Sequence, residues 1–588
     1  MNKAKLFSFA LAALMLGACS SDEIVESGGK PQWNSEGKGY INLAIQLPTQ
    51  PSTRASNSNN DQFDDGTPDE YAVKDATLIL FVDGQVNSAY DMKLNFSPVG
   101  SSNDNITTTA KITQKINSVS GSKIEALVVL NRNGMFTVNS DNTLSVGTEL
   151  MTGKSLDDLN SEVNTAIKNN DWHSNGFLMS NAVLTTKPGG TEVPTGNVVT
   201  LTEINAGNIK STEEEANANP AANIYVERAV AKVTLSAQKG SLTSSPAESP
   251  VEYTIDGWIL DNTNKSSKLV RTATNFGTWK GYASNSSSVL SPYRFVGNTA
   301  VGKDITNTDT YYRVYWGEDY NYAEVGQPGE YFNTIGGKTP DDTELIKADG
   351  VEAGYCFENT MDLANMQEAN STRVIVKAIF NGGNDFYIVD GDKSKFWTDE
   401  EVLKKEIAAR VLTNPIVYKW AKDNAAAGQT ITSEDFNVTF KDPAAGKIEV
   451  EDIEFTADAK LKEPHETFPE TDAVNAAKSS IEIDYYVGGA SYYSVWIKHF
   501  GDDLTPWKDG ETNTPTASNI YPGGEQNYLG RYGVLRNNWY DITVNSIKYL
   551  GSPTVEEVTG ETIDKIDSYI SVNINVLSWA KRTQEVEL

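Results

Sequence analysis

Apolar and polar residues alternate over short segments of this chain, and this period of two constrains the fold more than any other feature. Near the N-terminus the alternating apolar residues are Ile41, Leu43, Ile45 and Leu47, and Pro48 ends the segment. Successive side chains of a β-strand point to opposite faces, so these four residues are predicted to share one face of a strand. Similar segments follow at residues 76–82, 124–130, 198–204, 224–235, 480–487, 492–499, 539–544 and 569–579. The pattern predicts a mainly β fold built from β-sandwiches.

The last of these segments matches the first in length, period and number of large apolar residues. Its apolar residues are Ile570, Val572, Ile574 and Val576, and they alternate with Ser571, Asn573 and Asn575. The simplest interpretation is a closing strand of its own sandwich. Two strands with the same pattern at opposite ends of a chain are also able to fill the same kind of groove.

Helical signals interrupt the β pattern in two places. Ser155 opens a segment that predicts a short helix ending near residue 169. Thr398 and Glu401 have the spacing of a capping box, which predicts a helix with Thr398 as its N-cap that breaks at Asn414 and the following proline. Both helices are therefore expected as short insertions. The polar residues 205–222 are predicted to be a linker, with a domain boundary near residue 222.

The N-terminus has the features of an export signal. Two lysines precede a mostly apolar run at residues 6–16, which is shorter than the ~20 residues needed to span a bilayer. Small residues then precede Cys19, as in a lipobox. The sequence predicts a signal peptide at residues 1–18 and lipid, including palmitate, on Cys19. The alternative is an ordinary signal peptide that contains a cysteine. The second cysteine, Cys356, has no partner if Cys19 carries lipid, and it is predicted to be a small buried residue.

The composition argues against a nucleic-acid partner. The chain of 588 residues has 79 acidic and 49 basic residues, a formal net charge of −30. Binding to phosphates depends on clustered Lys and Arg, and the sequence contains no such cluster.

Motifs of enzyme chemistry are incomplete or absent. Residues 297–303 have the spacing of a phosphate-binding loop, but Asp304 stands where Ser or Thr would bind Mg²⁺. The chain has three histidines, too few for a His-rich metal site. No arrangement of nucleophile, base and acid stands out. The prediction is a protein without a cofactor, without a metal and without enzymatic activity.

Several longer motifs together carry a family resemblance. They are residues 226–233 (VERAVAKV), 313–322 (RVYWGEDYNY), 355–360 (YCFENT), 530–540 (GRYGVLRNNWY) and 572–588. With the lipobox, the early strand and the loop that contains Arg54, they resemble the fimbrillins, the type V pilins built from lipoprotein precursors. The second motif departs from the family pattern at Tyr320, where proline is usual.

The resemblance implies a fold and a maturation pathway. The expected fold is two transthyretin-like β-sandwich domains, at residues 55–222 and 223–588, after a propeptide at residues 19–54. The lipidated precursor would be carried to the outer membrane, where an arginine-specific protease would cut between Arg54 and Ala55. Removal of the first strand would open a hydrophobic groove, and the C-terminal strand of another copy would fill it.

The resemblance also implies a role. The subunit would belong to a fimbrium on the cell surface, would associate with accessory anchor and tip subunits, and would support adhesion. An anchor subunit would keep its lipid and a tip subunit would lack the terminal strand, so a stalk subunit is favoured. The alternative from another class is an anchored surface lipoprotein that binds glycans.

Overall fold

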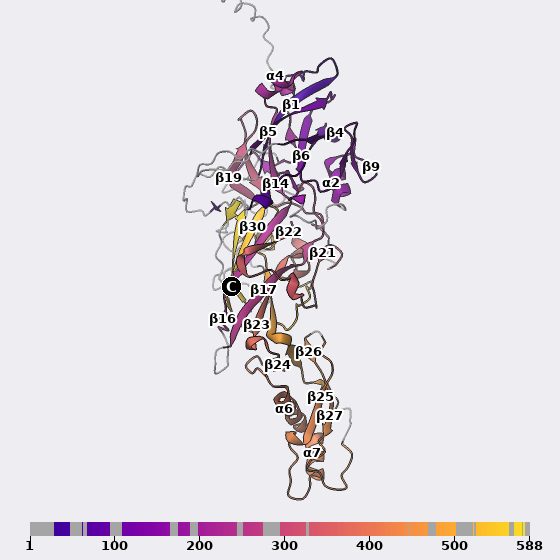
Figure 1. Ribbon diagram of the computed structural model, residues 1–588, viewed down its shortest axis with the longest axis vertical. Coiled ribbons are helices and arrows are strands. Elements are labelled where there is room, and N and C mark those ends of the chain that lie inside the picture. The colour runs from indigo at the N-terminus through magenta and orange to yellow at the C-terminus, as the bar shows by residue number, and fades with distance from the viewer. Residues whose placement is uncertain are drawn as a thin grey trace, which may run out of the picture.

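The computed structural model describes residues 29–47, 61–62, 67–94, 109–164, 175–188, 198–243, 251–273, 295–324, 329–444, 446–468, 475, 478–500, 521, 525–563, 570–578 and 580–582. These residues form an elongated, mainly β molecule, as predicted (Figure 1). The N-terminal sheet lies at one end, the sheets of the second half lie in the middle, and a module with two helices lies at the other end. No helix among the described residues is long and apolar enough to cross a membrane.

The N-terminal sheet has eight strands and contains both the first described strand, β1, and strand β14. Its main path runs β4 (Gln85–Met92), β3 (Ala76–Val82), β6 (Ile124–Leu130), β10 (Met179–Asn181), β14 (Ala222–Arg228), β1 (Lys38–Gln46) and β5 (Thr109–Asn117), and β13 (Thr202–Glu203) pairs with β6. The predicted strands at 76–82 and 124–130 are confirmed at their full length. Continuous apolar runs of this kind suit strands that are buried on both faces.

Two further sheets form the second half of the molecule. One runs β2 (Asp61–Gln62), β32 (Ala580–Arg582), β31 (Ile570–Ser578), β30 (Asn538–Ile547), β15 (Val230–Ala237) and β22 (Asp349–Phe357). The other runs β16 (Gly240–Ser241), β17 (Glu252–Asp261), β23 (Arg373–Phe380) and β29 (Ala490–Trp496). Side chains from both sheets, including Val233, Trp258, Val376 and Ile542, share one buried core.

A small sheet joins the two halves. It runs β12 (Val198–Val199), β11 (Leu184–Thr185), β20 (Thr310–Val314) and β19 (Val296–Lys303). Its first two strands come from the N-terminal half and its last two from the second half. The halves are therefore connected by backbone pairing as well as by side chains.

The predicted division at residue 222 falls at the first residue of β14, and β14 belongs to the N-terminal sheet. The next strand, β15, begins at Val230 in the second half, so the chain passes between sheets at Ala229. The prediction of a linker at residues 205–222 was wrong. Helix α4 (Glu213–Ala218) lies there, and Ile209, Ala216 and Ala221 are buried.

A helical module is inserted between β23 and β29. It contains α6 (Glu400–Leu412), α7 (Pro415–Asn424), the hairpin of β25 (Phe436–Phe440) and β27 (Val450–Phe455), and the sheet of β24 (Phe386–Val389), β28 (Ile483–Tyr486) and β26 (Lys447–Ile448). The module has its own buried core. The predicted N-cap Thr398 was wrong by one residue, because Asp399 accepts hydrogen bonds from the first-turn amides instead. Helix α6 ends at Leu412 with Thr413 as its C-cap, and Asn414 caps the next helix, with Pro415 at its first position.

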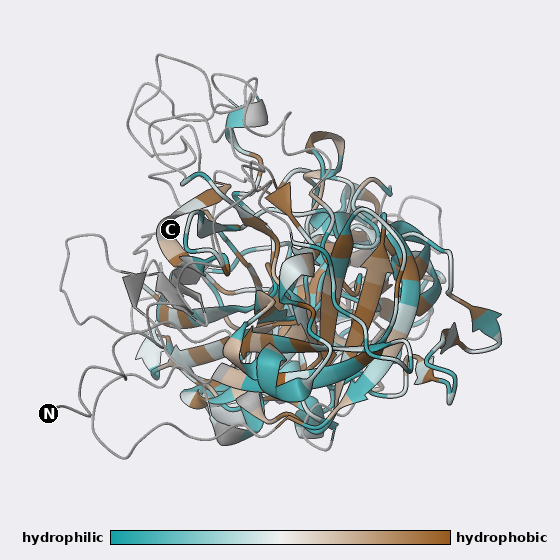
Figure 2. Ribbon diagram, turned by 90° about the horizontal axis from the view of Figure 1, so that it is seen from above, coloured by the Kyte–Doolittle hydropathy of each residue, from teal (hydrophilic) through white to brown (hydrophobic). Residues whose placement is uncertain are grey.

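Smaller elements complete the fold. They are α2 (Leu156–Asn164), the pair β18 (Thr263–Asn264) and β21 (Phe332–Asn333), and the strands β7 (Thr137–Val138), β8 (Leu144–Val146) and β9 (Glu149–Leu150). Helix α2 begins directly after Ser155, as predicted. Figure 2 shows hydrophobic residues concentrated along the central strands and hydrophilic residues toward the periphery.

Candidate functional site: the groove occupied by the first strand

Strand β1 lies between two other strands of the N-terminal sheet. It pairs in parallel with β14, from Leu43 opposite Ala222 to Gln46 opposite Tyr225. On its other side it pairs antiparallel with β5 along its whole length. Both of its backbone edges are therefore hydrogen-bonded to neighbours, and β5 is attached to the sheet through β1.

One face of β1 carries the predicted apolar residues. Ile41, Leu43 and Ile45 are fully buried and Leu47 is 3% exposed. All four belong to the core cluster of the N-terminal sheet, together with residues of β3, β6 and β14. The sequence therefore predicted correctly that these side chains share a face, and the structure shows that the face is the buried one.

The segment at residues 205–221, which we call the strap, pairs with the edge of β1 that faces β14, and its helix α4 contacts the opposite face through Asn217. Lys210 exchanges two backbone hydrogen bonds with Tyr40, and the amide of Ala221 donates to the carbonyl of Asn42. The strap thus continues the β14 side of the groove beyond the N-terminal end of β14. Helix α4 of the strap also contacts both β1 and β5.

Residues 41–45 of β1 are buried on both faces, whereas Lys38, Tyr40 and Gln46 are partly exposed. On the outer face Asn42 and Ala44 are each 6% exposed. A strand with two paired edges and two covered faces occupies a closed slot in the sheet. Sequence reasoning missed this feature, because the strap is polar and reads as a linker.

The C-terminal strand β31 pairs antiparallel with β30 of the same chain, from Ile570 opposite Ile547 to Ser578 opposite Asn538. After β31 the chain turns into β32, whose Lys581 and Arg582 lie opposite Gln62 and Asp61 of β2. In this structure the C-terminal strand therefore closes its own sheet. The segment that follows the predicted cleavage position lies beside it.

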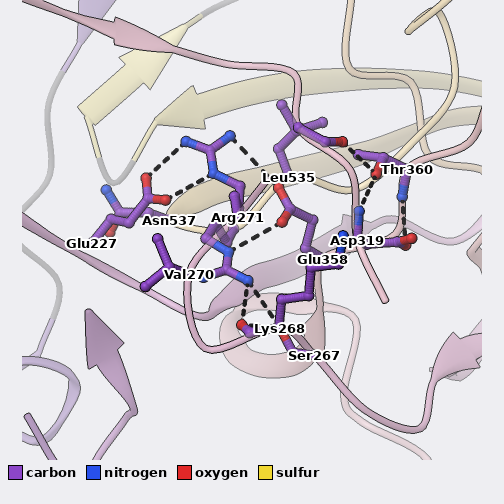
Figure 3. Close-up of polar contacts among 12 residues, drawn as sticks. Glu227, Ser267, Lys268, Val270, Arg271, Asp319, Glu358, Thr360, Leu535 and Asn537 are labelled. Atoms are coloured by element: carbon purple, nitrogen blue, oxygen red, sulfur yellow. Dashed lines mark hydrogen bonds and ion pairs between the residues drawn. The ribbon is translucent and has the colours of Figure 1, made fainter. Parts of the chain in front are cut away.

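Buried ion pairs join β14 to the second half (Figure 3). Arg271 donates from Nε to one oxygen of Glu227 at 2.8 Å and from Nη2 to the other at 3.0 Å. Arg536 donates from Nε to Glu358 at 3.1 Å, and Arg271 lies 3.7 Å from the same carboxylate. Arg313 is a third cation, 3.5 Å from Glu227. Because all of these side chains except Arg313 are at most 2% exposed, each charge depends on its partners. We call this set the junction network.

Asp319 adds a third carboxylate beside the junction network. It accepts hydrogen bonds from the Asn264 amide at 2.7 Å and from the backbone amide of Thr360 at 2.9 Å. Burial, together with the negative charge of Glu358, raises the pKa of Asp319 to about 7, although these hydrogen bonds act in the opposite direction. The protonation of this group is therefore sensitive to pH near neutrality.

The family motifs converge on this junction. Glu227 comes from the first motif, Arg313 and Asp319 from the second, Glu358 from the third and Arg536 from the fourth. Their conjunction in space was not predicted, since buried and exposed charged residues look alike in a sequence. Cys356 is a buried free thiol, as predicted, and burial raises its pKa to about 12.

The remaining predicted residues divide into two groups. Cys19, Arg54 and Ala55 lie outside the described residues. For Ile570, Val572, Ile574 and Val576 the structure describes the backbone strand alone. The glycine-rich residues 297–303 are part of β19, a strand, so they do not form a phosphate-binding loop. Among the described residues, no group of three or more His, Cys, Asp or Glu side chains is arranged to hold a metal ion.

Comparison with known proteins shows a match in the C-terminal region of the chain. Residues 484–585 match the family model described as "Major fimbrial subunit protein type IV, Fimbrillin, C-terminal". No curated protein matches the chain by sequence. The matched region includes β29, β30 and β31. This C-terminal region is therefore similar to the C-terminal part of the fimbrillins, which are major fimbrial subunits.

Solved structures similar to this chain carry related names. A fimbrilin from Porphyromonas gingivalis is 11% identical, covers 92% of this chain and 99% of its own, and has a TM-score of 0.33. A candidate cell adhesion protein from Parabacteroides distasonis is 13% identical, covers 92% and 100%, and has a TM-score of 0.34. A fimbrial assembly protein from the same organism is 13% identical, covers 54% and 95%, and has a TM-score of 0.21.

Proposed function

We propose that this chain is the precursor of a fimbrial stalk subunit that polymerises by donor-strand exchange. Proteolysis after Arg54 releases β1, and the C-terminal strand of another copy takes its place in the N-terminal sheet. The proposal includes a lipid on Cys19 that attaches the precursor to the outer membrane and leaves with residues 19–54. Accessory anchor and tip subunits would complete the fibre, which supports adhesion.

The enclosure of β1 is the observation that carries the proposal. Removing β1 leaves unpaired backbone groups on β5, on β14 and on the strap. It also uncovers the space filled by Ile41, Leu43, Ile45 and Leu47. An extended strand with alternating apolar side chains satisfies both needs, which is the principle of β-strand addition.

The energy available from refilling this slot is large. Burying one large apolar side chain contributes about 1.5–3 kcal/mol, so four contribute roughly 6–12 kcal/mol before the costs of ordering and association. An empty slot with a free edge would also be an aggregation hazard. A covalently attached first strand removes that hazard until export is complete.

The C-terminal strand has the sequence required of the donor. Ile570, Val572, Ile574 and Val576 repeat the apolar pattern of β1. In the single subunit β31 is paired with β30, so donation requires that this antiparallel ladder be given up and replaced by pairing with β5 and β14 of the next copy. The residues after Arg582 could extend the donor, since Val586 and Leu588 continue an alternating pattern.

The first test is the N-terminus of the mature surface protein, read by mass spectrometry. Cleavage after Arg54 predicts that the surface protein starts at Ala55. A surface form that still begins with lipidated Cys19 would overturn the stalk proposal. A substitution of Arg54 by Gln should keep the precursor uncut, whereas Lys30→Gln in the preceding segment should leave cleavage unchanged.

The second test is deletion of residues 570–588. Cleavage at Arg54 should persist, and the heat-resistant multimers seen by electrophoresis should disappear. Multimers of unchanged abundance would show that another segment is the donor. Deletion of residues 583–588 alone is the matched variant, and it separates a donor that ends at Arg582 from one that includes the tail.

A further inference from the structure

The outer face of β1 contains one buried hydrogen-bonding side chain, Asn42. Its amide nitrogen donates to Thr113 Oγ1 on β5 at 2.9 Å and to Asn217 Oδ1 on α4 at 3.2 Å. Thr113 in turn donates to Asn217. Three side chains from the strand, from the sheet and from the strap therefore form one network, and only Asn42 among them is removed with β1.

Thr113 and Asn217, which we call the polar pair, are hydrogen-bonded to each other and both accept from Asn42. Thr113 comes from β5, and Asn217 comes from the strap that covers the β14 side. Both point their oxygen atoms at the position of Asn42, so that position favours a side chain with an N–H or O–H group. An apolar side chain there would forgo both hydrogen bonds of Asn42, which costs free energy, although Thr113 and the exposed Asn217 would remain bonded to each other.

We propose that the polar pair selects the incoming strand by requiring a hydrogen-bond donor at the position of Asn42. This inference rests on the proposed strand exchange and adds a rule for the donor's sequence. The four apolar positions alone admit any strand with a period of two. The polar pair narrows this set to strands whose outward residue at that point is Asn, Ser, Thr or Gln.

The C-terminal strand of a second copy meets this requirement. When Ile570 takes the place of Ile41, Ser571 falls at the position of Asn42. When the strand runs in the opposite direction, with Ile570 in place of Leu47, Asn575 falls there. Both arrangements fill all four apolar positions and place a donor beside the polar pair. The proposal accounts for the polar residue at the position of Asn42, and Asn573 falls at the position of Ala44 in both arrangements.

The test is a peptide competition on the full-length chain after cleavage at Arg54. A labelled peptide of residues 38–48 is exchanged into the slot, and unlabelled variants compete with it. The Asn42→Ala peptide should compete about fivefold more weakly than the natural peptide, since each net hydrogen bond is worth about 0.5–1.5 kcal/mol. Asn42→Ser should stay within about twofold, because serine retains a donor.

A paired substitution in the protein shows whether the polar pair is the cause. Asn217→Ala should weaken the natural peptide about three- to fivefold and should leave the affinity of the Asn42→Ala peptide unchanged. Glu214→Ala, at an exposed position of the same helix, is the control and should alter neither peptide. Equal loss for both peptides in Asn217→Ala would overturn the proposal.

The outcomes separate this inference from the proposed function. If the natural peptide never enters the slot, strand exchange itself fails. If it enters and the Asn42→Ala peptide competes equally well, strand exchange stands and selection by the polar pair is wrong.

In the uncut precursor, Asn42→Ala and Asn217→Ala give a double-mutant cycle for the free energy of unfolding. Additive effects of Asn42→Ala and Asn217→Ala there would also overturn the proposal.

Discussion

The slot around β1 and the junction network both have buried centres, yet they are built from opposite chemistry. The slot offers apolar surface and unpaired backbone, which many strands of the right period can satisfy. The junction depends on Arg271 and Arg536 meeting Glu227 and Glu358 in one geometry. The slot therefore allows one strand to replace another, whereas the junction network holds one fixed arrangement of side chains.

Strand β14 takes part in both regions. Residues 222–225 form one wall of the slot, and Glu227, two residues further on, enters the junction network. Arg228 donates from Nε to the backbone carbonyl of Glu70 in the segment that precedes β3. The wall that an incoming strand would meet is thus fixed to the second half of the molecule, and it does not depend on β1 for its position.

The largest expected effect is loss of a junction charge. Glu358→Ala removes the partner of Arg536 and leaves two guanidinium groups without their shared carboxylate. Breaking a buried ion pair on one side typically costs 3–5 kcal/mol, so chemical denaturation should show a loss of about that size. The loss should be the same in the precursor and in the mature subunit.

The control for this variant is an exposed pair. Glu449→Ala breaks the ion pair with Lys441 on the surface of the helical module, where both side chains are more than half exposed. Surface pairs are worth about 0–1 kcal/mol, so the denaturation midpoint should barely move. A Glu358→Ala variant as stable as Glu449→Ala would show that the junction network does not hold the halves together.

The next largest effect concerns Leu43, a residue of β1 that fills the slot and takes no part in the junction network. Leu43→Ala should destabilise the precursor by about 2–5 kcal/mol, because Leu43 is fully buried in the core of the N-terminal sheet. Under strand exchange β1 is absent from the fibre, so the heat resistance of assembled fibres should be unchanged.

Leu78→Ala on β3 is the matched variant for that comparison. Leu78 is equally buried in the same core, but it stays in the mature subunit. It should weaken the precursor and the fibre alike. If Leu43→Ala weakened fibres as Leu78→Ala does, β1 would have to remain in the mature fibre.

The slot and the junction also differ in how far the sequence predicts them. The apolar face of β1 follows from a period of two, because strand geometry converts spacing directly into a shared face. The strap could not be predicted from a periodic pattern, since Ile209 and Ala221 are isolated apolar residues in a polar segment. The junction depends on residues far apart in the chain. A charged side chain carries no local sign that it will be buried.

The helix boundaries also show that the sequence predicts local structure only in part. Thr398 and Asp399 are both good caps, and the choice between them depends on how the chain leaves the preceding bridge between Trp397 and Tyr387. At Asn414 the sequence indicates a break, and the structure shows that the break is immediately capped to start α7. The local sequence therefore predicted where a helix starts and where it breaks, but not which residue caps it or that a second helix follows at once.

The smallest expected effect is a pH dependence inside the junction. The pKa of Asp319 is raised to about 7 from the ordinary 3.8. Between about pH 4 and pH 7 the folded chain therefore holds a proton on Asp319 that the unfolded chain has lost. A group of this kind contributes less stability as pH rises through that window, and its contribution is constant above about pH 7.

Asp319→Asn removes this titration and keeps a side-chain oxygen that can accept from Asn264 or Thr360. The difference in unfolding free energy, wild type minus Asp319→Asn, should fall from pH 4 to pH 7 and then level off. Asp442→Asn, at an exposed loop position, is the control and should show no such trend in that window. A difference that does not fall between pH 5 and pH 7 would mean that Asp319 is ionised in the folded chain at pH 5. The three arginines would then be balanced by three charged carboxylates, and the junction would be neutral across the whole range.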